Sequence, residues 1–184
     1  MLIVQVIPLR LSGLKKIVPS LFEDERGFFF ESYQEKRYRE NGIDLPFIQD
    51  NIAFSKKGTL RGLHFQSSPG QAKLVSCLEG EIWDVAVDLR LTSPTFGKWE
   101  ACFLNAKKQE QFFIPVGFAH GYLVLSETAK VHYKVSTLYD PATEKSVRWN
   151  DPDLAISWGI ERPILSEKDQ KSPFFKELFS CRFG

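Results

Sequence analysis

The chain has no long hydrophobic run and almost no net charge. Its longest apolar stretches, 112–116 and 28–30, are far too short to span a bilayer. Residues 1–9 lack the basic start and small-residue cleavage site of an export signal. Lysine and arginine total 24 against 23 for aspartate and glutamate, so no bulk positive field attracts nucleic acid or an anionic membrane. We therefore expect a soluble protein with neither kind of partner.

Cysteine and phosphate-binding glycine motifs are also scarce. Cys77, Cys102 and Cys181 are odd in number, widely spaced and have no histidine at a ligand interval, which argues against a disulfide framework or a zinc site. The cytoplasm is therefore the expected compartment. The sequence has no Walker-type glycine-lysine loop and no G-x-G-x-x-G fingerprint, so side-chain cations must bind any phosphate.

What the sequence does contain is the residue pattern of β-strands. Its length of 184 residues suits a single domain. Alternation is clearest at 81–90, where Trp83, Val85 and Val87 share one face and Asp84 and Asp88 the other, which predicts a one-sided antiparallel strand. Turn signals separate further β-rich runs at 28–33, 47–55, 60–66, 73–78, 99–104, 111–114, 121–125 and 131–138. Many short strands predict an all-β sandwich or barrel.

Helical signals are few. They predict a helix over 34–40, with Asn41-Gly42 as its stop, and a short piece near 168–179. The segment 2–7 reads as a strand that could form an added N-terminal arm. The expected architecture is therefore one all-β domain with minor helical segments.

A cation and an imidazole lie inside the mostly apolar run 60–66. Arg61 can hold a phosphate with its bidentate fork, and His64 can take a proton from a substrate near neutral pH. The alternative is a surface arginine beside a hydrogen-bonded core histidine. Strict alternation places the two side chains on opposite faces, so both can line one pocket only if the strand bulges, with Gly62 the expected place.

A second motif, P-x-G-x-x-H at 115–120, resembles the second conserved box of cupin barrels and would direct His120 into the barrel mouth. Metal-binding cupins have H-x-H followed by a glutamate in their first box, whereas this chain has His64-Phe65-Gln66. Half of the metal ligands are missing, so we expect no metal and a catalytic histidine instead.

Eight ordered motifs between about residues 18 and 169 carry a closer resemblance. They are DERGFFFE at 24–31, QDN at 49–51, LRGLHFQ at 60–66, QAKLV at 71–75, GEIWDVAVD at 80–88, SPTFG at 93–97, GFAHG at 117–121 and WNDP at 149–152. In these motifs the chain resembles the dTDP-4-dehydrorhamnose 3,5-epimerases. The resemblance implies a cupin-like antiparallel β-barrel (jelly roll) that inverts C3 and C5 of dTDP-4-dehydro-6-deoxy-D-glucose through enol(ate) intermediates, without a cofactor.

The resemblance also implies roles for catalytic residues. His64 would be the base, oriented by Asp169, and Tyr133 the acid on the opposite face of the sugar. Lys73 would stabilise charge on the C4 oxygen. From the residues alone, Tyr133 could be an ordinary core tyrosine, and Lys73 a solvated strand lysine.

Binding roles follow from the same resemblance. Arg26, Arg61 and Lys168 would surround the pyrophosphate, Glu31, Gln49, Asp50 and Asn51 would contact thymidine or sugar, and His120 and Glu144 would lie at the pocket rim. The alternatives are a salt-bridged turn and strand at 26–31 and a solvated loop residue at Glu144. A homodimer paired through N-terminal strands is expected, since edge strands favour partners. The tail after Ser172 carries no functional assignment.

Other functions stay open at this point. Single-centre 3- or 5-epimerases of related deoxysugars would share most of these residues. A metal-dependent cupin enzyme and a cupin-like sugar-nucleotide binding module are the alternatives from other classes.

Overall fold

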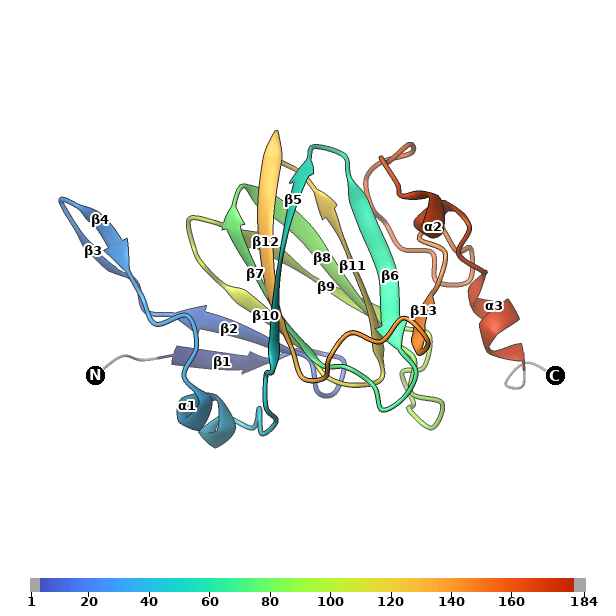
Figure 1. The fold of residues 1–184 in the computed structure, drawn as a ribbon, viewed down its shortest axis with the longest axis horizontal. Coiled ribbons are helices and arrows are strands. Elements are labelled where there is room, and N and C mark those ends of the chain that lie inside the picture. The colour runs from blue at the N-terminus through green and yellow to red at the C-terminus, as the bar shows by residue number, and fades with distance from the viewer. Residues whose placement is uncertain (1–3, 181–184) are drawn as a thin grey trace.

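The computed structural model describes residues 4–180, so Cys181 lies outside the described residues. Two antiparallel sheets face each other (Figure 1). The six-stranded sheet contains, in spatial order, β1 (Val4–Pro8), β2 (Lys15–Pro19), β10 (Gln111–Ile114), β7 (Lys73–Glu79), β12 (Thr128–Val135) and β5 (Gln49–Lys56). The five-stranded sheet contains β13 (Glu144–Ser146), β6 (Leu60–Gln66), β11 (Phe118–Val124), β8 (Glu81–Asp88) and β9 (Trp99–Asn105). The all-β expectation is confirmed.

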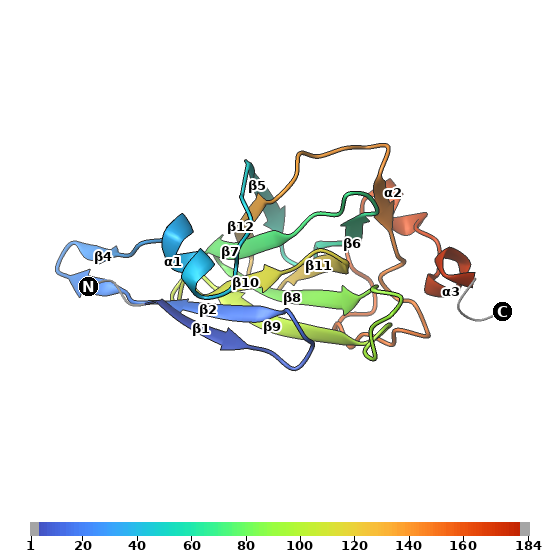
Figure 2. The same ribbon diagram turned by 90° about the horizontal axis from the view of Figure 1, so that it is seen from below.

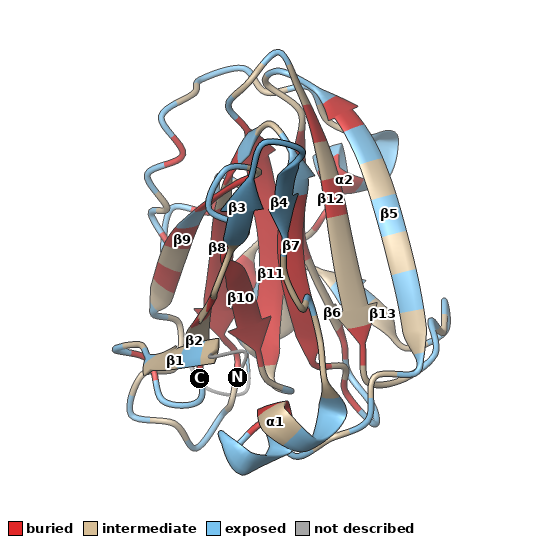
Figure 3. Ribbon diagram, turned by 90° about the vertical axis from the view of Figure 1, so that its left-hand side faces the viewer, coloured by how far each residue is buried: buried red, intermediate tan, exposed pale blue. Residues whose placement is uncertain are grey.

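The main core lies between the two sheets. Val75 and Val131 from the six-stranded sheet pack with Ile82, Ala86 and Val124 from the other, and all are almost completely buried. The central strands β7, β8, β10 and β11 are buried along nearly their whole length (Figure 3). Each fully buried aliphatic side chain contributes about 1.5 to 3 kcal/mol of transfer free energy, so this layer stabilises the barrel around the cavity described below.

A second apolar layer covers the outer face of the five-stranded sheet. Val85 and Val87 pack there against Leu154, Trp158 and Phe175 of the C-terminal segment. The prediction of a one-sided strand at 81–90 is therefore wrong, because β8 is covered on both faces. Asp84 and Asp88, assigned to a polar face, are completely buried and hydrogen-bonded inside the protein.

The helices are short. The predicted helix over 34–40 is confirmed as α1 (Glu35–Glu40), whose N-cap Gln34 accepts a hydrogen bond from the Arg37 backbone at 2.6 Å. The piece expected near 168–179 is two helices, α2 (Glu167–Gln170) and α3 (Phe175–Leu178). Pro173 explains the break, because proline lacks a backbone donor and disfavours helical geometry in the residue before it. Within residues 4–180, no helix has the length and apolar character needed to cross a membrane.

The hairpin of β3 (Phe22–Asp24) and β4 (Gly27–Phe29) projects from one end of the molecule, while α2 and α3 lie at the other (Figure 1, Figure 2). The strand predicted over 28–33 is therefore mostly wrong: strand structure stops at Phe29, and β4 pairs only with β3. Phe22, Phe28 and Phe29 are 47%, 49% and 68% exposed. This hairpin is an apolar projection that the rest of the described chain does not cover.

Candidate active site

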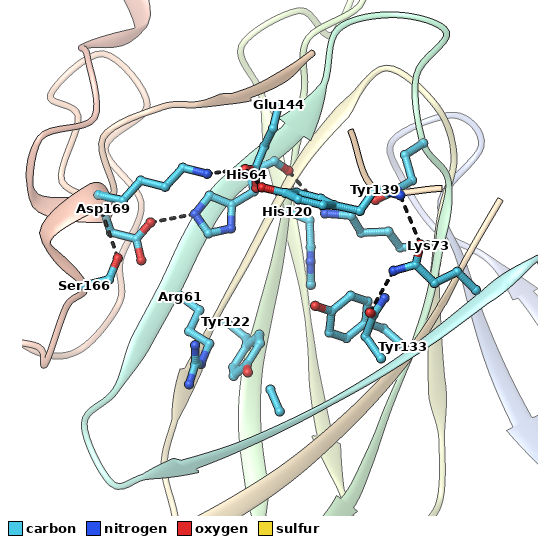
Figure 4. A pocket seen from close by; sticks show the side chains of 15 residues that line it. Arg61, His64, Lys73, His120, Tyr122, Tyr133, Tyr139, Glu144, Ser166 and Asp169 are labelled. Carbon is cyan, nitrogen blue, oxygen red and sulfur yellow. Dashed lines mark hydrogen bonds and ion pairs between the residues drawn. The ribbon is translucent and has the colours of Figure 1, made fainter. Parts of the chain in front are cut away.

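A cavity of about 370 Å³ opens between the two sheets (Figure 4). Most of the predicted site residues line this cavity. They are Gln49, Asn51, Arg61, His64, Lys73, His120, Tyr133, Glu144, Lys168 and Asp169. The three that it leaves outside are Arg26, Glu31 and Asp50. Segments from most of the chain length therefore converge on one hollow.

His64 and Asp169 form a hydrogen-bonded pair at one wall. His64 Nε2 lies 2.6 Å from Asp169 Oδ1, and the carboxylate is almost completely buried. Asp169 lies on α2, where its own backbone N–H donates to the N-cap Ser166 at 3.1 Å. Burial by itself raises the pKa of Asp169, but hydrogen bonds from His64 and Ser166 outweigh burial and hold it below its usual value. The ionised carboxylate therefore accepts a hydrogen bond from Nε2–H, which leaves the His64 Nδ1 lone pair available as a base.

A bulge at Gly62 places Arg61 and His64 on the same cavity. His64 pairs with His120 and Arg61 with Tyr122, so three steps along β6 match two steps along β11. Gly62 has φ of 137°, and a Cβ there would lie 2.5 Å from Gly121 Cα. Only glycine fits this close backbone approach. The bulge expected at Gly62 is confirmed.

The opposite wall carries Tyr133 on β12 and Lys73 on β7. Lys73 is 8% exposed, so the solvated-lysine alternative is wrong. Burial lowers its pKa to about 8, while Asp84 and Glu144 act in the opposite direction. Its Nζ donates to the His64 carbonyl at 3.4 Å. Burial raises the pKa of Tyr133, so its phenol keeps its proton at neutral pH.

His120 has its own buried carboxylate. Its Nε2 lies 2.9 and 3.1 Å from the two oxygens of Asp84 on β8. Burial lowers the pKa of His120 and raises that of Asp84, although each partner favours the charged form of the other. Sequence reasoning missed Asp84 because alternation placed it on a solvent face.

The rim is a chain of hydrogen bonds. Lys168 Nζ and the Tyr139 hydroxyl both donate to Glu144, the latter at 2.9 Å. Gln49 accepts from the Tyr139 backbone at 3.0 Å and donates to Asn51 at 2.9 Å. The Glu144 side chain is 15% exposed, so the reading of a solvated loop residue is wrong. Tyr139 lies in an irregular loop, and sequence reasoning missed it together with Gln71, Tyr122 and Ser166.

The three predicted residues outside the cavity have other partners in this chain. Arg26 hydrogen-bonds Asp24 in the projecting hairpin, Glu31 pairs with Arg37 at 2.9 Å, and Asp50 pairs with Lys134 at 2.8 Å. Asp50 alternates with Gln49 and Asn51 along β5 and so points to the other face of the sheet.

Across residues 4–180, no three histidine, cysteine, aspartate or glutamate side chains are grouped so that they could hold a metal ion. The residue positions that follow His64 in the first box are occupied by Phe65 and Gln66.

The chain is similar to known proteins over most of its length. The family model described as dTDP-4-dehydrorhamnose 3,5-epimerase matches residues 8–177. The enzyme of that name from Methanothermobacter thermautotrophicus is 47% identical over 163 residues, which is 87% of this chain and 88% of the relative. A dTDP-4-dehydrorhamnose 3-epimerase from Streptomyces niveus is 40% identical over 172 residues, covering 92% of this chain and 83% of that protein.

A solved structure gives the same result. The dTDP-6-deoxy-D-glucose-3,5-epimerase of Legionella pneumophila, in complex with dTDP-4-keto-L-rhamnose, superposes with a TM-score of 0.94 at 47% identity, covering 98% of this chain and 97% of that one. This agreement confirms the cupin-like barrel expected from the motifs. Because the family model spans nearly all of the described fold and the cavity, the chain belongs to the dTDP-4-dehydrorhamnose 3,5-epimerase family and is an isomerase.

Proposed function

We propose that the protein epimerises C3 and C5 of dTDP-4-dehydro-6-deoxy-D-glucose to give dTDP-4-dehydro-L-rhamnose, in the biosynthesis of dTDP-L-rhamnose. The C4 ketone acidifies the hydrogens at both neighbouring carbons, so each centre can invert through an enolate. A base, an acid and a group that stabilises the enolate oxygen are sufficient. The reaction needs no redox cofactor, because no carbon changes its oxidation state overall.

The observation that carries this proposal is the placement of His64 and Tyr133 on opposite walls. His64 belongs to the five-stranded sheet and Tyr133 to the six-stranded sheet, with the cavity between them. A sugar bound between the sheets has one ring face toward each residue. A proton taken by His64 from one face and returned by Tyr133 to the other inverts the carbon.

Each step has a group suited to it. His64 Nδ1 takes the carbon-bound proton, and the Asp169 carboxylate stabilises the imidazolium that forms. Lys73, deep in the cavity, donates to the developing oxyanion at C4. Tyr133 then protonates the enolate carbon from the other wall. The resulting phenolate regains a proton from solvent, and the His64 imidazolium gives up its proton to solvent.

The nucleotide binds toward the rim in this proposal. Arg61 and Lys168 are the cations that contact the pyrophosphate, while Gln49, Asn51 and Glu144 contact the thymidine or sugar. His120, held by Asp84, contacts the hexose from the same sheet as His64. The support for these binding roles is that the residues proposed to contact the nucleotide or the hexose all line the cavity.

We also propose a homodimer in which Arg26 and Glu31 reach the pocket of the partner subunit. The exposed phenylalanines of the β3–β4 hairpin and the exposed Ile52 and Phe54 of edge strand β5 are the apolar surfaces that a second copy would cover. We expect this dimer to work in the cytoplasm without a nucleic-acid or membrane partner. Light scattering tests the dimer, and restored activity on mixing Arg26→Ala with His64→Ala subunits tests the shared pocket.

A single-centre epimerase is the second candidate, because a relative named as a 3-epimerase is 40% identical to this chain. Incubation with dTDP-4-dehydro-6-deoxy-D-glucose in deuterated water separates the two. NMR should show deuterium at both C3 and C5, and coupling to a 4-ketoreductase should give dTDP-L-rhamnose. Labelling at one carbon only would leave the single-centre function, and a bound but unlabelled ligand would indicate a binding module.

A further inference from the structure

Arg61 is held by weak, uncharged partners. Its Nε donates to the Ser55 hydroxyl at 3.0 Å, and its Nη2 lies 3.5 Å from the Phe54 carbonyl, at the limit of a hydrogen bond. A guanidinium binds phosphate oxygens more strongly than neutral acceptors, because charge-assisted hydrogen bonds are about twice as strong. A phosphate in the cavity therefore competes effectively with Ser55 for Arg61.

Arg61 also has room to turn. It lines the main cavity and a second hollow on its other side, which Ser55, Thr59 and Ile164 border. Figure 4 shows the guanidinium beside Tyr122 and directed away from His64. The side chain is exposed, so no packed layer prevents its movement.

Tyr122 lies next to this group with an unused hydroxyl. Its side chain is 3% exposed, and its oxygen is one of the few buried side-chain polar atoms within residues 4–180 that form no hydrogen bond. Against the larger effect of burial, Arg61 and Ser55 lower the pKa of Tyr122, although the Tyr122 hydroxyl has no partner within hydrogen-bonding geometry. Burial raises that pKa to about 12, so the group remains a neutral donor. A buried donor without an acceptor is destabilising, and such groups call for an explanation.

We propose that Ser55 and Tyr122 position Arg61 for an anionic ligand by exchanging hydrogen-bond partners. Without ligand, Ser55 accepts from Arg61 and the Tyr122 hydroxyl is left unpaired. When Arg61 turns to the phosphate oxygens, the Ser55 hydroxyl is released from it, rotates into hydrogen-bonding geometry with Tyr122 and accepts from it. Binding therefore satisfies a group that the free protein leaves unsatisfied, an inference that rests on the proposed role of Arg61 in pyrophosphate binding.

This exchange predicts opposite effects on stability and affinity. Tyr122→Phe removes an unsatisfied hydroxyl from the free protein, so its midpoint of thermal unfolding should rise by about 2 to 4 °C. The same variant loses the hydrogen bond formed on binding, so its Kd for dTDP should weaken about fivefold. A tyrosine with a purely structural role cannot give this combination.

The test is calorimetric titration with dTDP, combined with thermal unfolding, on four proteins: wild type, Tyr122→Phe, Ser55→Ala and the double variant. Ser55→Ala frees Arg61, which should strengthen dTDP binding, and removes the acceptor for Tyr122, which should weaken it. The two effects should nearly cancel in the Kd. Tyr122→Phe should then have no effect on the Kd when Ser55→Ala is present. Tyr38→Phe is the matched control, because the buried Tyr38 hydroxyl is already bonded to Gln111. It should lower the unfolding midpoint and leave the Kd unchanged.

The possible failures are distinguishable. If the wild-type protein does not bind dTDP, the proposed function itself is overturned. If it binds dTDP but Tyr122→Phe lowers the unfolding midpoint, or weakens dTDP equally with and without Ser55→Ala, the exchange of partners is overturned and the proposed function stands.

Discussion

His64 and His120 lie directly opposite each other on neighbouring strands, yet each is hydrogen-bonded to a different buried carboxylate. His64 pairs with Asp169 from a helix after the barrel, whereas His120 pairs with Asp84 from the adjacent strand β8. The His64 side chain is 28% exposed and that of His120 only 7%. The more accessible imidazole suits proton transfer with the substrate, and the buried one suits a fixed contact.

His64→Asn and Tyr133→Phe should separate the two proton transfers. His64→Asn should abolish exchange of the substrate hydrogens with deuterated water, because no enolate forms without the base. Tyr133→Phe should reduce epimerised product more than exchange, because the acid acts after the enolate has formed. Each loss should be about 10² to 10⁴-fold, measured by NMR of the substrate and product pools. Equal and small effects of both substitutions would make these residues structural.

Asp169→Asn should reduce kcat about 10² to 10⁴-fold while the protein stays folded. The amide is nearly the same size as the carboxylate, but it cannot stabilise the imidazolium and can hold His64 in the wrong tautomer. Glu167→Gln on the same helix is the control, because the Glu167 side chain is 91% exposed and its ion-pair partner is Lys171 on the protein surface. An active Asp169→Asn enzyme would remove Asp169 from the mechanism.

Activity should fall above about pH 8, where Lys73 loses its proton. The pKa of Lys73 is lowered from 10.5 in the folded protein, so the unfolded chain binds more protons between these values. Lys73 therefore adds stability as the pH rises through that window, so its own deprotonation cannot cause a loss of activity by unfolding the protein. The pH–rate profile checks the expected fall in activity, and thermal unfolding over the same pH range checks the expected contribution of Lys73 to stability.

Asp84→Asn should move this alkaline limb to lower pH, because Asp84 favours the charged form of Lys73. Lys73→Met should remove the limb together with most of the activity. If the alkaline fall of the pH–rate profile keeps its midpoint in Asp84→Asn, that fall must be due to the titration of a group other than Lys73.

Gly62→Ala should destabilise the protein by roughly 3 kcal/mol or more, since strain and steric clash combine at this site. Its Cβ would meet Gly121 Cα at 2.5 Å, and the backbone would retain φ of 137°. Gly27→Ala is the control, because Gly27 has φ of 122° but open space around it, which isolates the conformational cost. Chemical denaturation measures both, and equal losses would show that the close approach to Gly121 is unimportant.

Local patterns in the sequence were sufficient for most strands and for the pocket wall around Gly62. The run 60–66 became β6 with its bulge in the expected place, because glycine is where a strand can depart from alternation. Motif residues on β5, β6, β7 and β11 line the cavity because these strands are paired around it, whereas Arg26 and Glu31 of the 24–31 motif do not.

The remainder depended on tertiary structure that no local pattern reports. Alternation assigned Asp84 to solvent because it cannot show that the C-terminal segment covers the opposite face of β8. The hairpin run 28–33 is apolar like a core strand, yet it has only β3 as a partner within the described chain. Tyr122 shares the face of His120 on β11, so alternation from His120 could have found it, whereas Tyr139 reaches the cavity from a loop with no such pattern.

The C-terminal segment that covers the five-stranded sheet also supplies Asp169, which follows His64 by 105 residues. The barrel strands are all made before this residue, so a growing chain completes its pocket walls before its proton-transfer machinery. Detachment of this outer layer alone would withdraw the carboxylate and leave the barrel core intact. On heating, activity can thus be lost before the circular-dichroism signal of the β-sheets, because catalysis depends on the attachment of the C-terminal segment.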